Sequence, residues 1–191
     1  MIKLFLGISL ILVGLFILGS TFLPIIREEL GYDLRGYQTP QSLNTLEPID
    51  REFGILIPKI NANAHVIKNV NPFKEKEYQL ALSQGVAHAK DTALPGQKGN
   101  IFIFSHSSSD FFNAAKHNSV FYLLSKLEKE DQIKLFYEDK EYDYSVDNKK
   151  IVETDAVEYL TDETKNETLT LMTCWPPGTS LKRLIIQATR L

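Results

Sequence analysis

Short apolar runs separated by turn-forming residues recur along most of the chain, from about residue 53 to the C-terminus. Alternating or unbroken apolar stretches of this length are typical of β-strands. The pattern predicts strands at residues 53–58, 64–70, 100–105, 133–137, 142–146, 169–174 and 184–188, with a further strand starting at residue 151. Residues 100–105 are apolar on both faces, which indicates a central strand.

Helical signals are few. Residues 74–82 are good helix formers with Tyr78 and Leu82 one turn apart, and Ser119 can cap a second helix running through Leu127. The connections are too short for many parallel crossovers, so a mostly antiparallel sheet that closes on itself is expected. The fold class is therefore expected to be mainly β: a closed or nearly closed β-barrel of about eight strands with a few short helices.

The N-terminal region follows a different pattern. Residues 4–26 carry no charge, and as a helix they would span about 34 Å, enough to cross a hydrocarbon core of about 30 Å. A cleaved secretory signal is the alternative, but the run is longer than a typical signal core and no small-x-small cleavage pattern follows. We expect an uncleaved transmembrane anchor with residues 1–3 in the cytoplasm, because the charge bias around the segment slightly favours that orientation.

The segments that follow the predicted anchor, and the composition and charge of the chain, narrow the possible classes of protein. Residues 27–50 look like an extracytoplasmic linker, although the second half could equally be an irregular arm packed on the domain. Residues 51–191 would then form one catalytic domain. A hydrophobic content of 43% and a charged content of 24% are globular values. The net charge of -3, without a basic cluster, argues against nucleic acid as a partner.

The candidate chemistry starts from a single cysteine, Cys174, at the end of the predicted strand 169–174. One cysteine in an exported domain cannot form an internal disulfide, which favours a chemical use of the thiol. Arg183 begins the next predicted strand, so the two groups should meet at one end of a sheet. Free thiols have a pKa of about 8.5 and need a nearby cation or imidazole to react as thiolates. The alternative is a buried, inert cysteine and an ordinary surface arginine.

The chain has four histidines as possible partners for the thiol. His106 follows the central strand 100–105 at a strand end, as Cys174 does, and an imidazole there can act as a general acid for a leaving amine. His65 lies in a strand and His117 in a polar loop, so both are expected to be structural or solvent residues. His88 lies among small residues and could be close to the site.

Three segments taken together resemble the sortase family. Residues 99–106, 169–174 and 182–186 match, in order and spacing, its strand ending in histidine, its Thr-Leu-x-Thr-Cys strand and its basic strand with the site arginine. The similarity covers about residues 53–191, and an N-terminal anchor is usual in the family. Residues 85–88 followed by residues 92–96 also resemble the smaller housekeeping-like and class D or E branches.

Two departures from the family pattern concern the surroundings of the site. Ser105 stands where a glycine often precedes the histidine, which changes local backbone freedom without removing a chemical group. The loop after the cysteine, which begins with Trp175, is short, so the substrate groove on that side would have a different shape.

The resemblance implies a sortase-type barrel and a membrane-anchored cysteine transpeptidase. Cys174 would attack a carbonyl in a sorting signal similar to Leu-Pro-any-Thr-Gly and form a thioester, and His106 would protonate the leaving amine. Arg183 would stabilise the oxyanion and, with Thr173, bind the substrate. The acyl group of a surface protein would pass to an amine of peptidoglycan or of a pilin-like protein. No cofactor or metal is required, and the acidic residues 153–163 are expected to form a solvated loop rather than a calcium site.

Two other functions fit parts of the sequence. An exported cysteine peptidase or amidase would use the same Cys174 and His106 with water as acceptor, but such enzymes usually place the cysteine before the histidine. A non-enzymatic adhesion or scaffold domain would leave the unpaired thiol, His106 and Arg183 without a shared reason.

Overall fold

The structure is a computed structural model that describes residues 7–9, 11–16, 46–107, 120–160 and 164–191. The chain divides into two compact units, Met1–Thr39 and Pro40–Leu191, and each is described by itself.

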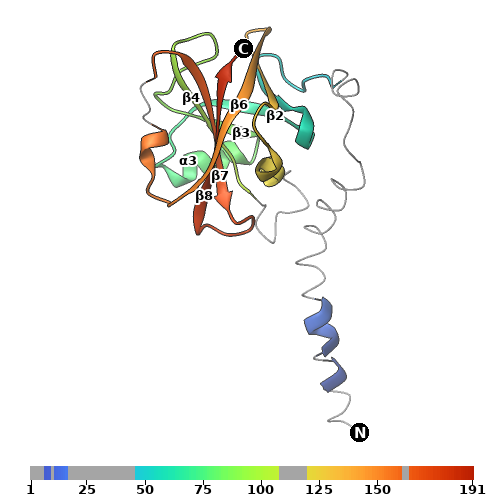
Figure 1. The fold of residues 1–191 in the computed structure, drawn as a ribbon. Coiled ribbons are helices and arrows are strands. Elements are labelled where there is room, and N and C mark those ends of the chain that lie inside the picture. The colour runs from blue at the N-terminus through green and yellow to red at the C-terminus, as the bar shows by residue number, and fades with distance from the viewer. Residues whose placement is uncertain (1–6, 10, 17–45, 108–119, 161–163) are drawn as a thin grey trace. The chain divides into compact units, whose positions relative to one another are not determined.

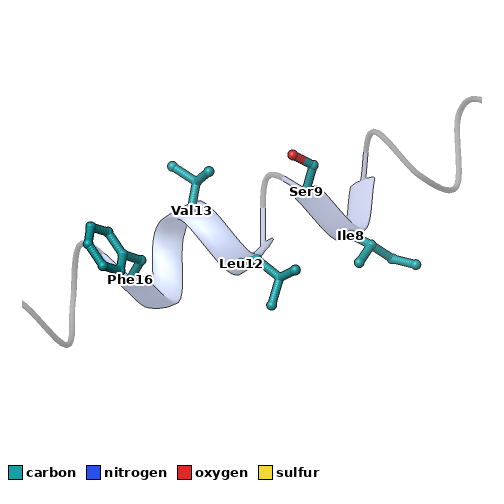
Figure 2. Close-up of a pocket in the computed structure, with 5 residues that line it drawn as sticks. All are labelled: Ile8, Ser9, Leu12, Val13 and Phe16. Atoms are coloured by element: carbon teal, nitrogen blue, oxygen red, sulfur yellow. The ribbon is translucent and has the colours of Figure 1, made fainter.

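The described residues of the first unit, 7–9 and 11–16, are helical and mostly exposed. Five of their side chains line a shallow, largely apolar pocket, formed by Ile8, Ser9, Leu12, Val13 and Phe16 (Figure 2). None of the helices in the described part of the chain is long and apolar enough to cross a membrane. The predicted anchor, residues 4–26, lies largely outside the described residues and stays a prediction.

The described part of the second unit forms a closed barrel of eight strands (Figure 1). The strands are β1 (Phe53–Ile57), β2 (Ala62–Val70), β3 (Val86–Ala89), β4 (Gly99–Phe104), β5 (Gln132–Tyr137), β6 (Lys140–Val152), β7 (Glu167–Trp175) and β8 (Lys182–Arg190). Their order around the barrel is β1-β2-β3-β4-β7-β8-β6-β5, and β5 pairs with β1 to close it. The expected mainly β, closed barrel is therefore confirmed.

The helices described in this unit are short: η1 (Pro58–Ile60), α3 (Glu75–Leu82), η2 (Tyr122–Lys126) and η3 (Val157–Tyr159). The helix predicted at residues 74–82 is confirmed as α3. The second predicted helix is observed as the short 3-10 element η2, and its expected cap, Ser119, lies outside the described residues.

Two strand predictions need correction. The segment from residue 151 is not a separate strand, because β6 runs unbroken through it and bends at a bulge between Val146 and Asn148. The polar residues at this bulge interrupt the alternation that marks a strand, and so resemble a loop. Strand β3 was not predicted, since its four residues carry little of the β-branched signal, yet all of them are buried. It pairs with β2 in parallel, and α3 lies in the crossover between them.

The two faces of β4 contact two different sets of apolar side chains. Ile101 and Ile103 are fully buried on one face. Phe102 and Phe104, on the other face, belong to a cluster to which α3 contributes Ala81 and Leu82. A strand buried on both faces agrees with the prediction of a central position. As a result, α3 is held beside the outer face of β4 (Figure 1).

The last residues before β1 form an arm attached to β2. The side-chain amide of Asn63 donates to the carbonyl of Glu47 at 2.8 Å and accepts from the backbone N–H of Ile49 at 3.0 Å. Asp50 pairs with His65 at 2.8 Å. The described end of the predicted linker therefore follows the packed-arm alternative, and residues 27–45 lie outside the described part.

Candidate active site

Cys174 and Arg183 are direct cross-strand partners in the antiparallel pair β7–β8. Residues paired in this way point to the same face of a sheet with their Cβ atoms about 5 Å apart. Cys174 is a free, half-buried thiol, and Arg183 is also half-buried. The expected meeting of thiol and guanidinium at one end of a sheet is therefore confirmed, and the physical cause is the short turn that joins the two strands.

His106 is brought to the same end by the parallel pair β4–β7. The regular register ends with Phe104 opposite Met172, and the backbone N–H of Ser105 still donates to the Met172 carbonyl at 3.1 Å. Continuing this alignment by two residues places His106 at the level of Cys174. Because side chains alternate along a strand, the residue two beyond Phe104 faces the side on which Cys174 lies. Cys174 on β7, Arg183 on β8 and His106, two residues past the end of β4, thus belong to neighbouring strand ends.

The imidazole also has a partner from the helix that covers this face. Nε2 of His106 lies 3.1 Å from Oε1 of Gln79 on α3. The neighbouring helix residue, Tyr78, packs its ring edge-on against Phe104, with centroids 6.4 Å apart. Gln79 was not identified from the sequence, because its only signal was membership in a helix and the contact joins residues 27 positions apart.

The guanidinium of Arg183 turns towards its own loop. Its Nη1 donates to the carbonyls of Ser180 at 3.2 Å and Lys182 at 3.0 Å. Both bonds are solvent-exposed, so exchanging these acceptors for water or for the carbonyl of a bound peptide has a small net cost. Arg183 can therefore redirect its donors to a substrate or an oxyanion beside Cys174.

Thr173 lies on the opposite face of β7 from Cys174 and is 2% exposed. Its hydroxyl donates to the carbonyl of Ser105 at 2.9 Å, which ties β7 to the segment that carries His106. The expected substrate contact of Thr173 stays a prediction, and the structure gives this hydroxyl a partner within the protein.

The remaining histidines have structural surroundings. His88 is 1% exposed, accepts the Asn69 N–H at Nδ1 and lies with Nε2 2.9 Å from the Ala93 carbonyl, to which it donates. Burial lowers the pKa of His88, against the opposing effect of the Ala93 bond, so the ring is neutral near pH 7. His65, on β2, pairs with Asp50 of the arm described above. His117 lies outside the described residues.

Within the described ranges, no group of three or more His, Cys, Asp or Glu side chains is placed to hold a metal ion. Part of the acidic segment 153–163 lies outside those ranges, so the expectation of a metal-independent site stays a prediction.

The described barrel thus pairs a free cysteine with an arginine across two strands, and a histidine follows the end of the strand beside them. A family model of the sortase domain matches residues 55–191. The chain belongs to the sortase family.

Individual relatives agree with this assignment. The chain is 33% identical to Sortase D of Bacillus subtilis (strain 168) over 141 residues, which is 72% of this chain and 63% of that protein. It is 30% identical to Sortase A of Bacillus anthracis over 132 residues, 69% of this chain and 56% of that protein. The chain therefore matches less than two thirds of the length of these curated relatives. The crystal structure of sortase C-1 from Actinomyces oris shares the fold, with a TM-score of 0.63, 23% identity and 81% of both chains covered.

Proposed function

We propose that this protein is a cysteine transpeptidase. The observation that supports the proposal is the pairing of β4, β7 and β8: Cys174 and Arg183 are cross-strand partners, and His106 follows the end of β4, the strand beside β7. A thiol, a proton-transferring imidazole and a guanidinium supply the nucleophile, the general acid and the oxyanion stabiliser that acyl transfer through a thioester uses. Membership of the sortase family supports the same chemistry.

The reaction has two halves. In the first, the thiolate of Cys174 attacks a peptide carbonyl carbon, and Arg183 stabilises the oxyanion that forms. His106 gives a proton to the departing amine as the C–N bond breaks, which leaves a thioester on Cys174. In the second half, an incoming amine attacks the thioester carbon and gives a proton to His106. The C–S bond then breaks and the thiolate is restored.

The substrate proposed is the C-terminal sorting signal of a surface protein, similar to Leu-Pro-any-Thr-Gly. The acceptor is an amine of cell-wall peptidoglycan or of a pilin-like protein. The family assignment and the similarity to Sortase D and Sortase A support signals and amine acceptors of this general kind. The identity to Sortase D also favours the class D branch over the others.

We further propose that the protein is a single-pass protein of the cell membrane with its barrel on the outer side. The support is the uncharged run at residues 4–26 together with Lys3 before it. An enzyme tethered there would meet anchored substrates as they emerge from the membrane.

The test uses the full-length protein with a pool of peptides that bear Leu-Pro-any-Thr-Gly variants, with triglycine as acceptor. Intact-mass spectrometry should show an acyl adduct on Cys174 that triglycine converts to a joined peptide, and Cys174→Ala should abolish both. Cleavage to the free acid at a rate indifferent to triglycine would identify a peptidase that uses water. If a thiol reagent labels Cys174 but no peptide of the pool acylates it, the proposal that the protein transfers sorting signals of this kind is wrong.

A further inference from the structure

Asn100 is a buried polar side chain that the proposed reaction does not use. It is the second residue of β4 and is 5% exposed. Its Oδ1 accepts the hydroxyl of Thr170 on β7 at 2.8 Å, and its Nδ2 donates to the backbone carbonyl of Tyr159 at 2.8 Å. A donor on one side of the amide and an acceptor on the other fix its orientation. The side chain therefore connects β4 and β7 to a residue 59 positions farther along the chain.

The segment that Asn100 reaches is the turn at η3, residues 157–160. η3 has no buried residue, and Val157 is 53% exposed. The N–H of Val157 donates to the Asp155 carbonyl at 2.8 Å, and the N–H of Leu160 donates to the Val157 carbonyl at 2.9 Å. Bonds of this kind shape a turn but do not attach it to the sheet. The hydrogen bond from the buried amide provides such an attachment.

Other contacts of this turn are less directional than the Asn100 bond. Tyr159 and Leu160 are half-buried and pack against the apolar cluster on the outer face of β4. Nζ of Lys150, an exposed residue of β6, lies 5.8 Å from the centre of the Tyr159 ring. Apolar packing has no preferred direction, whereas a hydrogen bond holds one donor against one acceptor. Asn100 thus selects the position that Tyr159 and Leu160 take on the cluster.

The surface made in this way lies on the same face of the sheet as Cys174. Phe104 belongs to the cluster and is paired with Met172, and paired residues share a face. Met172 is half-buried and packs against the same cluster as Tyr159 and Leu160. Cys174 is two residues farther along β7, so its side chain points to that face as well. Apolar side chains there are available to those of a peptide whose carbonyl reaches the thiol.

We infer that Asn100 is a positioning residue: its bond to the Tyr159 carbonyl holds residues 157–160 on the outer face and so shapes the apolar surface that binds the peptide of the proposed transpeptidation. The inference rests on the proposed function for its effect on the substrate. The position of the turn itself can be measured without turnover, because the Leu160 N–H closes it and exchanges with solvent when it opens.

The experiment compares three variants of the full-length protein. Asn100→Asp keeps the acceptor for Thr170 but loses the donor to the Tyr159 carbonyl. Asn100→Leu loses the same donor without adding a charge, and serves if a buried carboxylate prevents folding. Thr170→Val is the matched control, because it removes the other 2.8 Å bond of the same amide and leaves the Tyr159 bond in place.

Two quantities are measured for each variant: hydrogen exchange at the Leu160 amide, and the dependence of Cys174 acylation on the concentration of a Leu-Pro-any-Thr-Gly peptide. We expect both Asn100 variants to speed the exchange about tenfold and to raise KM about three- to tenfold, because the turn holds its binding position for a smaller fraction of the time. The maximal acylation rate should not change. Thr170→Val should match the unmodified protein in exchange at Leu160, in KM and in maximal rate.

Unchanged exchange at Leu160, or an unchanged KM, in a folded Asn100 variant would overturn the inference. A fall in the maximal rate with the same KM would also contradict it, because Asn100 would then act through the barrel and not through the peptide-binding surface. An equal rise of KM in Thr170→Val would assign the effect to general loosening of β4 and β7. Failure of the proposed function gives a different result: the unmodified protein would not be acylated, while exchange at Leu160 would still respond to Asn100→Asp.

Discussion

Replacing Thr173 by valine removes a hydroxyl that joins the two strands on which the site is built. Oγ1 of Thr173 donates to the carbonyl of Ser105 at 2.9 Å, and the side chains of both residues are buried. Valine preserves the shape of threonine but cannot donate, so the Ser105 carbonyl loses this partner. The substitution therefore separates two roles for Thr173: the substrate contact that the family resemblance implies, and attachment of the His106 segment to β7.

The magnitude follows from the burial of this bond. A lost hydrogen bond that leaves a buried acceptor without its partner costs about 1–3 kcal/mol. We expect the free energy of unfolding to fall by about 2 kcal/mol, which moves a urea midpoint by about 1 M when the slope is about 2 kcal/mol per M. Acylation of Cys174 should slow about tenfold as well, because His106 directly follows the loosened residue and small displacements of reacting groups are costly.

Urea unfolding of the full-length protein can be followed by the fluorescence of its single tryptophan, Trp175. Thr170→Val is the matched control, since Thr170 is equally buried on β7 and donates to Asn100 at 2.8 Å, farther from the site. It should lower stability by a similar amount and leave the acylation rate per folded molecule unchanged. An unchanged urea midpoint in Thr173→Val together with a raised KM would refute the attachment role and support the substrate contact.

Three further substitutions test other parts of the structure. Arg183→Lys keeps the charge but loses the planar fork of donors, so acylation measured by mass spectrometry should fall about 100-fold with an unchanged urea midpoint; full activity would exclude an oxyanion role. Gly85→Ala would place a Cβ 2.3 Å from the carbonyl oxygen of His65, so urea unfolding should show a loss of about 2–3 kcal/mol, and an unchanged midpoint would contradict this packing. Burial lowers the pKa of His88 in the folded state, so below pH about 6.5 the unfolded chain binds a proton that the folded chain does not. As the pH falls further, the free energy of unfolding therefore declines by up to about 1.4 kcal/mol per pH unit, until the pKa of His88 in the folded state is reached. Urea titrations at several pH values should show a flatter decline for His88→Gln, and an identical slope would mean that His88 does not titrate in this way.

The agreement in the number of strands conceals two errors that cancel. The predicted strand starting at residue 151 is the second half of β6, and the short strand β3 was missed. Both errors arise from local pattern: a bulge places polar residues inside a strand, and small residues such as Ala87 and Ala89 carry little β-propensity. These small residues suit β3 because they leave room for the side chains that α3 and β4 pack against it.

Most strands and the meeting of Cys174 with Arg183 could be predicted from the sequence, with strand ends within two residues of those observed except at β6. That meeting is local, because a short turn makes β7 and β8 neighbours and alternation then settles the face. The sequence also predicted that His106 lies at a strand end. Its three ordered segments indicated the family.

Which strand lies beside β7, and that Gln79 contacts His106, could be known only from the folded molecule. The β4–β7 pair is parallel and joins residues 68 positions apart, as the Thr173 to Ser105 bond shows. A hydrophobic pattern specifies the faces of a strand but not the strand that lies beside it. Bringing β4 and β7 together closes a long segment of chain, and the entropy lost in doing so is offset only when the whole barrel forms. The contact of Gln79 with His106 depends on that same closure: α3 reaches the end of β4 only after β2, β3 and β4 have assembled beneath it.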